Sequence, residues 1–334
     1  MLKIDNKIIS ESSPTYIIAE IGINHKGNIN LCKKMLLKAK QCGADAAKLQ
    51  IVDPKFSYNK NTKSYNIFSK NKLNINELIN LKKYSKKIGI TIFATPGDFN
   101  SIKVIKKLKF PAIKISSGLL TSLPLIKKIA DTNLPIIFST GMAYLNEIKK
   151  VVRILRSKKS KFAILKCTSL YPAPFNTINL NSIKTLKNFK TIVGYSDHTT
   201  TNDACIAAVS CGAKIIEKHF TLNKNLKVPD QVVSADPVQF KDLVKSIRKT
   251  EELLGEDYIF PSKLEISQRK KIYRVLVCCK KIFKGEKFTF NNLALKRVKN
   301  NRLGLEPEFI SKVIGKKSKL NISEDEMIQK KHFY

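Results

Sequence analysis

The stretch TIVGYSDHTTTNDACIAAVSCGAKIIEKHF, residues 191–220, decides the fold expected for this chain. Two short apolar runs, 191–194 and 214–218, flank a segment with helical character, and a strand–helix–strand unit of this kind favours parallel strands. A histidine follows each run closely, His198 after the first and His219 after the second. Because catalytic groups gather at the carboxyl ends of parallel strands, we expect both imidazoles at one edge of the sheet.

The same alternation of apolar strands and amphipathic helices runs from Tyr16 to Leu254. The expected strands lie near residues 17–22, 46–51, 90–95, 112–116, 135–139, 161–166, 191–194 and 214–218, and the expected helices near 29–42, 75–88, 99–108, 122–131, 145–157, 178–188, 202–210 and 237–254. Eight of each is the number in a (β/α)8 TIM barrel of usual length. An open, doubly wound sheet is disfavoured because GINHKGN, after the first strand, lacks the GxGxxG turn.

The alternation stops after Leu254, which divides the chain. Residues 1–255 are the expected barrel domain, and residues 256–268, with Pro261 and several serines, predict a linker. Residues 269–334 predict a small β-rich domain with short strands such as RVLVCC and KFTF. A domain of this size has a marginal core, so we expect it to lean on a neighbour.

The composition excludes several classes of protein. The 334 residues are 43% hydrophobic, which is enough for a large core. The formal charge of +36 is nearly all lysine, since only seven of the 62 basic residues are arginine. Nucleic-acid readers favour the bidentate arginine fork, so we expect no nucleic-acid partner. There is no apolar run of membrane-spanning length, no signal peptide and no CxxC pair, which together predict a cytoplasmic protein without a membrane partner.

Polar residues follow every expected strand. They are Glu20, Asn24, His25, Lys48, Gln50, Thr95, Lys114, Ser116, Ser117, Ser139, Thr140, Thr168, Ser169, Tyr171, Ser196, Asp197, His198, Glu217 and His219. Because the carboxyl ends of barrel strands meet at one mouth, these side chains should converge there.

Two of these residues, Lys48 and Lys114, lie inside otherwise apolar strands, where an unpaired ammonium group is costly. One candidate partner is an anionic substrate, since lysines, hydroxyls and the backbone N–H groups of glycine turns bind phosphate. The other is a buried carboxylate such as Glu20 or Glu217. The hydroxyls are equally open to two interpretations, because strand-end serines also serve as helix N-caps.

The two strand-end histidines are half of the four in the chain. Neutral imidazole binds ions such as Mn, Fe and Zn, so the pair predicts a divalent-metal site. The alternative is that His198 and His219 are structural residues held by hydrogen bonds.

Taken together, the motifs resemble those of the sialic acid synthases, which make nine-carbon nonulosonic acids. The chain contains, in that family's order, the segments IIAEIGINHKGN, AAKLQ, FATPGD, AIKISSG, STGM, CTSLYPAP, GYSDHT, IEKHFTL and VPDQVVSADP. The tail is similar to the family's C-terminal antifreeze-like (SAF) domain, and the resemblance runs from about Tyr16 to Lys317.

The resemblance implies a metal-dependent condensation of phosphoenolpyruvate with the open-chain form of an N-acylated, mannosamine-like sugar, with release of phosphate. It implies Mn²⁺ as the cofactor, held by His198 and His219. It assigns phosphoenolpyruvate binding to Lys48, Thr95, Lys114, Ser117, Ser139, Ser169 and Ser196, and sugar binding to Gln50, Tyr171, Asp230 and Arg297. The candidate catalytic residues are Glu20, Lys48 and Lys114, with Glu20 either relaying protons or holding a water molecule.

The position of Arg297 in the small domain has a further implication. In the family that this chain resembles, the corresponding arginine reaches the sugar's N-acyl group from the partner subunit. The resemblance therefore implies a domain-exchanged homodimer.

The resemblance leaves the sugar open. N-acetylmannosamine leads, which would give an N-acetylneuraminate-type product. A 2,4-diacetamido-trideoxy hexose, giving legionaminic or pseudaminic acid, is the alternative, because Leu119 stands where many relatives carry an acidic residue and Gly97 replaces a usual phenylalanine. Another phosphoenolpyruvate-dependent 3-deoxy-sugar acid synthase is less favoured, since such enzymes need basic residues for a second phosphate and usually lack the small domain.

Overall fold

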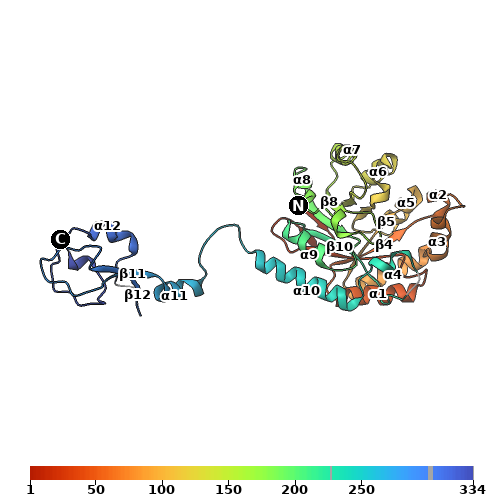
Figure 1. Cartoon of the computed structure of the whole chain (residues 1–334). Helices are drawn as coiled ribbons and strands as arrows, with labels where there is room; N and C mark the ends of the chain where they lie inside the picture. Colours follow the sequence, from red (N-terminus) through yellow and green to blue (C-terminus); the bar gives the residue numbers. More distant parts are fainter. Residues whose placement is uncertain (226–227, 300–303, 334) are drawn as a thin grey trace. The chain divides into compact units, whose positions relative to one another are not determined.

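Eight parallel strands close into a barrel in the computed structural model, which describes residues 1–225, 228–299 and 304–333 (Figure 1). In barrel order the strands are β10 (Ile215–His219), β3 (Tyr16–Gly22), β4 (Ala46–Ile51), β5 (Thr91–Pro96), β6 (Ile113–Ile115), β7 (Ile136–Ser139), β8 (Phe162–Cys167) and β9 (Ile192–Asp197). Every expected strand is present, so the predicted TIM barrel is confirmed. The strands read as continuous apolar runs because both of their faces are buried.

A helix follows each of the barrel strands along the chain. These helices are α1 (Ile29–Gln41), α4 (Ile75–Ile88), α5 (Phe99–Lys107), α6 (Leu123–Ala130), α7 (Leu145–Ser157), α8 (Ser182–Lys187), α9 (Asp203–Ser210) and α10 (Pro237–Leu254). Their apolar stripes pack against the strands in one core that includes Leu36, Leu81, Ile126 and Leu155. The expected helix 178–188 is shorter, because Asn179 has a left-handed φ of 53°, which interrupts helical backbone before Ser182. Residues 175–177 form a separate 3-10 turn, η2 (Phe175–Thr177).

A hairpin that the sequence analysis missed packs beneath the barrel. Strands β1 (Leu2–Ile4) and β2 (Lys7–Ile9) pair through a turn in which Asp5 has a φ of 53°. Leu2, Ile4 and Ile9 join an inner core formed by residues near the amino ends of the strands. The hairpin thus covers the end of the barrel opposite the mouth, and the Asp-Asn pair in LKIDNKII was the available turn signal.

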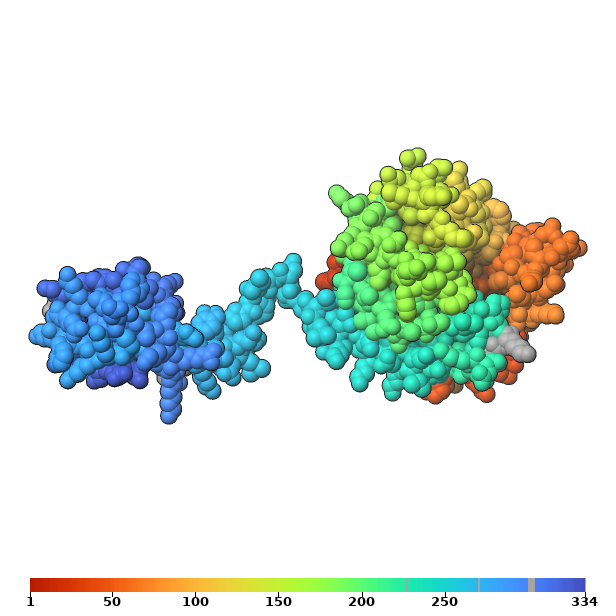
Figure 2. All heavy atoms as spheres, viewed as in Figure 1, coloured from red at the N-terminus to blue at the C-terminus, as the bar shows by residue number. Residues whose placement is uncertain are grey.

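Two further helices, α2 (Pro54–Ser57) and α3 (Lys63–Asn71), lie between β4 and α4 and were also not expected. They form a projection at the side of the barrel, orange in Figures 1 and 2. The ring of Tyr58 stacks on that of Phe68 with centroids 5.1 Å apart. This projection forms one wall of the cleft described below.

Residues 256–334 form a second compact unit. It contains α11 (Lys263–Ile272), the antiparallel pair β11 (Arg274–Cys278) and β12 (Leu293–Arg297), α12 (Ile310–Val313), and the 3-10 turns η4 (Pro307–Phe309) and η5 (Lys330–His332). RVLVC is the strand β11, as expected. KFTF was wrongly expected to be a strand: Lys287 makes only an isolated bridge, and Phe288 packs in the core of the unit. Residues 263–268 of the expected linker belong to α11.

No described helix is long and apolar enough to cross a membrane.

Candidate active site

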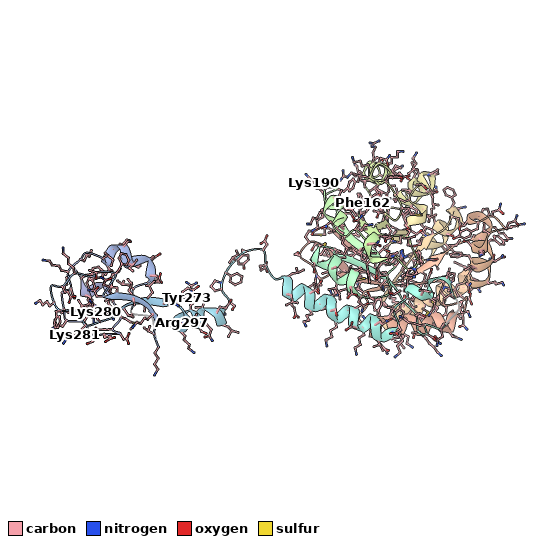
Figure 3. The ribbon with its side chains drawn as sticks, in the orientation of Figure 1. Phe162, Lys190, Tyr273, Lys280, Lys281 and Arg297 are labelled. Carbon is pink, nitrogen blue, oxygen red and sulfur yellow. The ribbon has the colours of Figure 1, made fainter. Side chains whose placement is uncertain are left out.

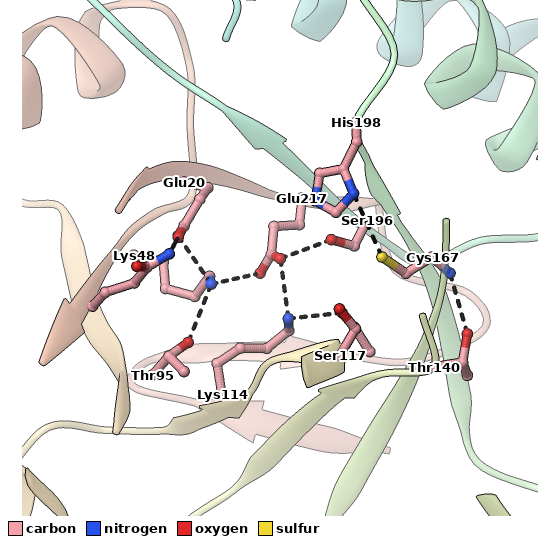
Figure 4. A network of polar contacts seen from close by, with 12 residues as sticks. Glu20, Lys48, Thr95, Lys114, Ser117, Thr140, Cys167, Ser196, His198 and Glu217 are labelled. Carbon is pink, nitrogen blue, oxygen red and sulfur yellow. Dashed lines mark hydrogen bonds and ion pairs between the residues drawn. The ribbon is translucent and has the colours of Figure 1, made fainter. Parts of the chain in front are cut away.

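Four charged side chains meet inside the mouth of the barrel. Glu20 on β3, Lys48 on β4, Lys114 on β6 and Glu217 on β10 are each no more than 4% exposed. Lys48 Nζ lies 3.0 Å from Glu20 Oε2 and 3.6 Å from Glu217 Oε2, and Lys114 Nζ lies 3.0 Å from Glu217 Oε1. Figure 4 shows Glu217 between the two lysines. The carboxylate alternative from the sequence therefore describes the pairing in this structure.

The two carboxylates of this network have opposite pKa shifts. Burial raises the pKa of Glu20, and the charge of Glu217 adds to the effect. Burial also opposes ionisation of Glu217, but the ammonium groups of Lys114 and Lys48 outweigh it and hold the pKa of Glu217 below its usual range. Glu217 is thus the permanent counter-charge, and Glu20 is the carboxylate better placed to carry a proton at neutral pH.

Hydroxyl groups surround the lysines. Lys114 Nζ donates to Ser139 Oγ at 2.7 Å, and Lys48 Nζ donates to Thr95 Oγ1 at 3.3 Å. Ser196 Oγ donates to Glu217 at 2.9 Å. Such donors are the groups that bind a phosphate or carboxylate.

Ser117 and Ser169 form a second hydroxyl pair, with their Oγ atoms 2.7 Å apart. Gly141 permits this contact: its φ is +49°, and a Cβ there would lie 2.2 Å from Ser117 Cβ and 2.6 Å from Ser169 Oγ. The structure thus brings together all seven residues expected to bind phosphoenolpyruvate.

The two histidines lie side by side, with ring centroids 5.4 Å apart. His198 Nδ1 is 2.6 Å from the carbonyl oxygen of Thr168 and donates to it, which leaves Nε2 as the atom with a lone pair. Tyr171 OH donates to that Nε2 at 2.8 Å. His219 Nδ1 is buried without a hydrogen-bond partner and lies 3.7 Å from Asp230 Oδ2.

The histidine pair fits a divalent metal ion chemically. Burial lowers the pKa of His198 to about 4 and that of His219 to about 3, so both imidazoles are neutral at pH 7. Neutral nitrogen is the ligand that such ions require. Among the described residues no cluster of three or more His, Cys, Asp or Glu side chains is arranged to hold a metal, so the chain offers two imidazoles and leaves other positions for water or substrate.

A buried ion pair that the sequence analysis did not single out holds the loop of His198. Lys218 Nζ lies 2.5 Å from Asp197 Oδ2 and donates to the carbonyl oxygens of Thr199 and Thr201. Asp197 also accepts from the backbone N–H of Thr199 at 2.9 Å. These bonds fix the residues on both sides of His198. The available signal was a further lysine inside an apolar strand, at position 218.

Two of the four residues expected to bind the sugar, Gln50 and Asp230, lie near Glu20. Gln50 Nε2 donates to Glu20 Oε1 at 3.1 Å. A Cβ on Gly22 would lie 3.2 to 3.4 Å from Glu20, Gln50 and Asp230, so these side chains crowd one glycine. Tyr171, by contrast, packs on His198. The fourth residue, Arg297, is exposed on β12 of the C-terminal unit (Figure 3).

A cleft of about 520 Å³ opens beside this network. Its lining residues are Gln50, Val52, Ser57, Tyr58, Phe68, Thr95, Gly97, Ser116, Ser117, Gly118, Leu119, Met142, Ser169 and Tyr171. The cleft is large enough for a small-molecule substrate, since such sites are roughly 300–1,000 Å³. Its polar wall includes the hydroxyl groups of Thr95, Ser117 and Ser169, and its other wall is apolar.

A closed barrel with lysines, carboxylates and histidines converging at the strand ends has the architecture of a TIM-barrel enzyme. The chain belongs to the NeuB family, which its residues 35–258 match, and residues 273–333 match the SAF domain.

Several relatives of this chain are named as synthases of nonulosonic acids. The N,N'-diacetyllegionaminic acid synthase of Campylobacter jejuni is 38% identical, over 94% of this chain and 99% of its own length. The pseudaminic acid synthase of Helicobacter pylori is 34% identical, over 91% and 94%. An uncharacterized protein of Methanocaldococcus jannaschii is 40% identical, over 98% and 97%.

A solved structure shares the fold. The N-acetylneuraminic acid synthetase of Leptospira borgpetersenii, in complex with citrate, superposes with a TM-score of 0.77 at 33% identity, covering 81% of this chain and 96% of that one. The predicted family is therefore confirmed.

Proposed function

We propose that this protein condenses phosphoenolpyruvate with an open-chain N-acyl hexosamine to give a nonulosonic acid and phosphate. The buried network of Lys48, Lys114, Glu20 and Glu217 beside the two histidines carries the proposal. The two ammonium groups pair with two carboxylates and still have N–H donors for an anion. The hydroxyl pairs around them supply further donors.

Lys48 and Lys114, with Ser139 and Thr95, bind the phosphate and carboxylate of phosphoenolpyruvate and direct its CH2 carbon towards the aldehyde. The electron pair of the enol double bond then forms the new C–C bond, and the aldehyde oxygen takes a proton to become a hydroxyl group. Water adds to the enol carbon, and the C–O bond to phosphate breaks. Positioning of this kind can lower the barrier by several kcal/mol.

Glu20 holds the proton that these steps exchange. Its pKa is raised by burial, and its Oε1 accepts from Gln50, a residue of the cleft wall. A carboxyl group that is near its pKa at working pH can both give and take a proton.

His198 and His219 would hold the divalent metal, for which Mn²⁺ is our proposal. When bound, such an ion supplies Lewis-acid polarisation of the aldehyde. The carbonyl of Thr168 keeps His198 in the tautomer that presents Nε2, and Tyr171 OH, now on that nitrogen, is free to turn to the sugar instead.

N-acetylmannosamine is one candidate sugar. The apolar wall of the cleft favours the second, a 2,4-diacetamido-trideoxy hexose. Leu119, Val52, Phe68 and Met142 offer no hydrogen bond to a hydroxyl group, whereas a deoxy carbon needs none. The 38% identity to a legionaminic acid synthase agrees with this choice.

The C-terminal unit takes part through Arg297 in our proposal, which places that arginine in the mouth of a partner barrel in a domain-exchanged homodimer. A chain truncated after residue 260 should then fold as a barrel, judged by circular dichroism, and lose sugar turnover. A truncated chain with full activity would refute the exchange.

The reaction is tested by following phosphate release from phosphoenolpyruvate with Mn²⁺. N-acetylmannosamine, a 2,4-diacetamido-trideoxy hexose and arabinose 5-phosphate are compared, and products are identified by mass spectrometry. We expect release with the two N-acyl sugars and none with the phosphopentose. Turnover of arabinose 5-phosphate alone would overturn the proposal.

A further inference from the structure

A second hollow of about 460 Å³ adjoins the cleft. Both share three wall residues, Ser57, Gly97 and Leu119. The second space, called here the outer hollow, is lined beyond them by Phe56, Asp98, Phe99, Asn100, Ser122 and Leu125. Gly97 lies in the wall between the two spaces and is closely packed, since a Cβ there would lie 2.8 Å from the methyl groups of Val52 and 3.1 Å from Ser57 Oγ.

The outer hollow has an apolar part formed by two aromatic and two leucine side chains, beside the polar residues Ser57, Asp98, Asn100 and Ser122. Phe56 is 67% and Phe99 is 51% exposed, so two aromatic rings face solvent there without cover. An alkyl group of a ligand that packs on such rings would bury their apolar surface. Phe56 belongs to α2 of the projection, and Phe99 is the first residue of α5.

The one acidic residue of the outer hollow is already satisfied. Asp98 caps α5: its Oδ1 accepts from Ser101 N at 2.9 Å, and its Oδ2 accepts from Asp53 N at 2.8 Å and from Ser101 Oγ at 2.6 Å. No lysine or arginine is among the described residues that line either space. A phosphorylated substituent of a ligand would have no positively charged side chain to pair with there, whereas a neutral substituent needs none.

The chemistry sets the direction in which a sugar lies. The aldehyde must sit near His198, and Tyr171, which touches His198, lines the inner cleft only. An extended open chain that starts there runs towards the shared wall at Gly97 and Leu119. Its far half is the part that reaches the outer hollow.

We infer that the outer hollow is a subsite for an N-acyl group longer than acetyl on the far half of the sugar. This inference rests on the proposed function, since it takes the inner cleft to be the sugar site. The cleft alone has the volume of a small-molecule site, so the outer hollow is additional room with a partly apolar wall.

The test compares ligands that cannot react. The alditols of two sugars, one with a 4-acetamido and one with a 4-butanamido group, are titrated by calorimetry into the full chain with Mn²⁺ and phosphoenolpyruvate. Each fully buried methylene strengthens binding about fourfold, so the butanamide should bind roughly five- to fifteenfold more tightly. The Ser122→Trp variant fills the outer hollow and should abolish the gain. Thr121→Trp, an exposed neighbour that does not line it, should keep the gain.

Equal or weaker binding of the butanamide by the parent chain would overturn the inference, as would a gain that survives Ser122→Trp. Failure of the proposed function is a separate result, because the alditols report binding whether or not the parent sugars release phosphate. If neither alditol binds, the inner cleft is not a sugar site and both proposals fall.

Discussion

The ammonium group of Lys114 lies 3.0 Å from the carboxylate of Glu217, and both side chains are almost completely buried. The same carboxylate accepts from Ser196 and lies 3.6 Å from Lys48. One acidic side chain from the last barrel strand thus neutralises lysines from two other strands. Without a bound anion, both lysine ammonium groups already have a carboxylate partner. They are thus preorganised for an anion and are not left unpaired in its absence.

Replacing Glu217 should destabilise the barrel. The variant Glu217→Gln keeps an acceptor for Lys114 but leaves two ammonium groups facing one carboxylate. Removing one partner of a buried pair costs about 3–5 kcal/mol, which denaturant unfolding at pH 7 can measure. Added phosphate should restore part of the loss by binding the lysines. Asp131→Asn, which removes an exposed ion pair with Lys158, is the matched control and should change little. Unchanged stability of Glu217→Gln would contradict the network.

Gly141 should tolerate no side chain. In Gly141→Ala the new Cβ would meet Ser117 and Ser169, so the hydroxyl pair must separate, and KM for phosphoenolpyruvate should rise on the order of tenfold. Gly89→Ala is the control, because Gly89 also has a positive φ of 70° but nothing within 4 Å of its Cβ position. It shares the backbone strain of about 1 kcal/mol without the clash. Similar KM values for both variants would show that the contact does not matter.

Metal binding should depend on both imidazoles. Chelation followed by dialysis is expected to stop phosphate release, and Mn²⁺ to restore it. In His198→Ala, Mn²⁺ affinity measured by electron paramagnetic resonance should fall by more than the roughly 10–100-fold typical of an outer-shell substitution. His25→Ala serves as a control at a histidine outside the pair. Wild-type Mn²⁺ affinity in His198→Ala would rule out the site.

His25 should make the metal-free protein sensitive to acid. Burial lowers its pKa from 6.5 to about 4, and its Nδ1 accepts from Gly27 N at 3.1 Å. The unfolded chain binds a proton below pH 6.5 while the folded chain does not, so stability is full above that pH and falls towards pH 4. The loss is on the order of 3 kcal/mol for this group. Unfolding curves of His25→Gln between pH 7 and 4 should therefore show a shallower slope than the parent. Equal slopes for His25→Gln and the parent chain would show that another group causes the acid sensitivity.

Leu119 should influence the choice of sugar. Leu119→Glu places a carboxylate where the cleft is apolar, so kcat/KM for the trideoxy sugar should fall relative to that for N-acetylmannosamine. A polar group left unpaired costs about 1–3 kcal/mol, which corresponds to a change in the ratio on the order of tenfold. The conservative variant Leu119→Met should leave the ratio unchanged. A ratio that does not move in Leu119→Glu would remove Leu119 from the sugar site.

Much of the barrel could be predicted because its strands are buried on both faces and its helices are amphipathic, so each element carries its own pattern. The hairpin β1–β2 and the helix α3 were not predicted, because their sequences carry a weaker pattern. The hairpin has three residues per strand, which is too short to show a period, and α3 is a nine-residue helix without a buried residue. Lys218 was overlooked because its partner, Asp197, is distant in sequence. The two residues become neighbours only when β9 and β10 pair in the barrel.

The sequence by itself determined the barrel, the order of its strands and which polar side chains stand at their carboxyl ends. A strand's direction and the alternation of its side chains are local properties, so they can be read along the chain. Only the tertiary structure decided that Lys48 and Lys114 pair with Glu20 and Glu217, that His198 presents Nε2, and that a second hollow adjoins the cleft. Each of these depends on distances between strands that meet only when the barrel closes.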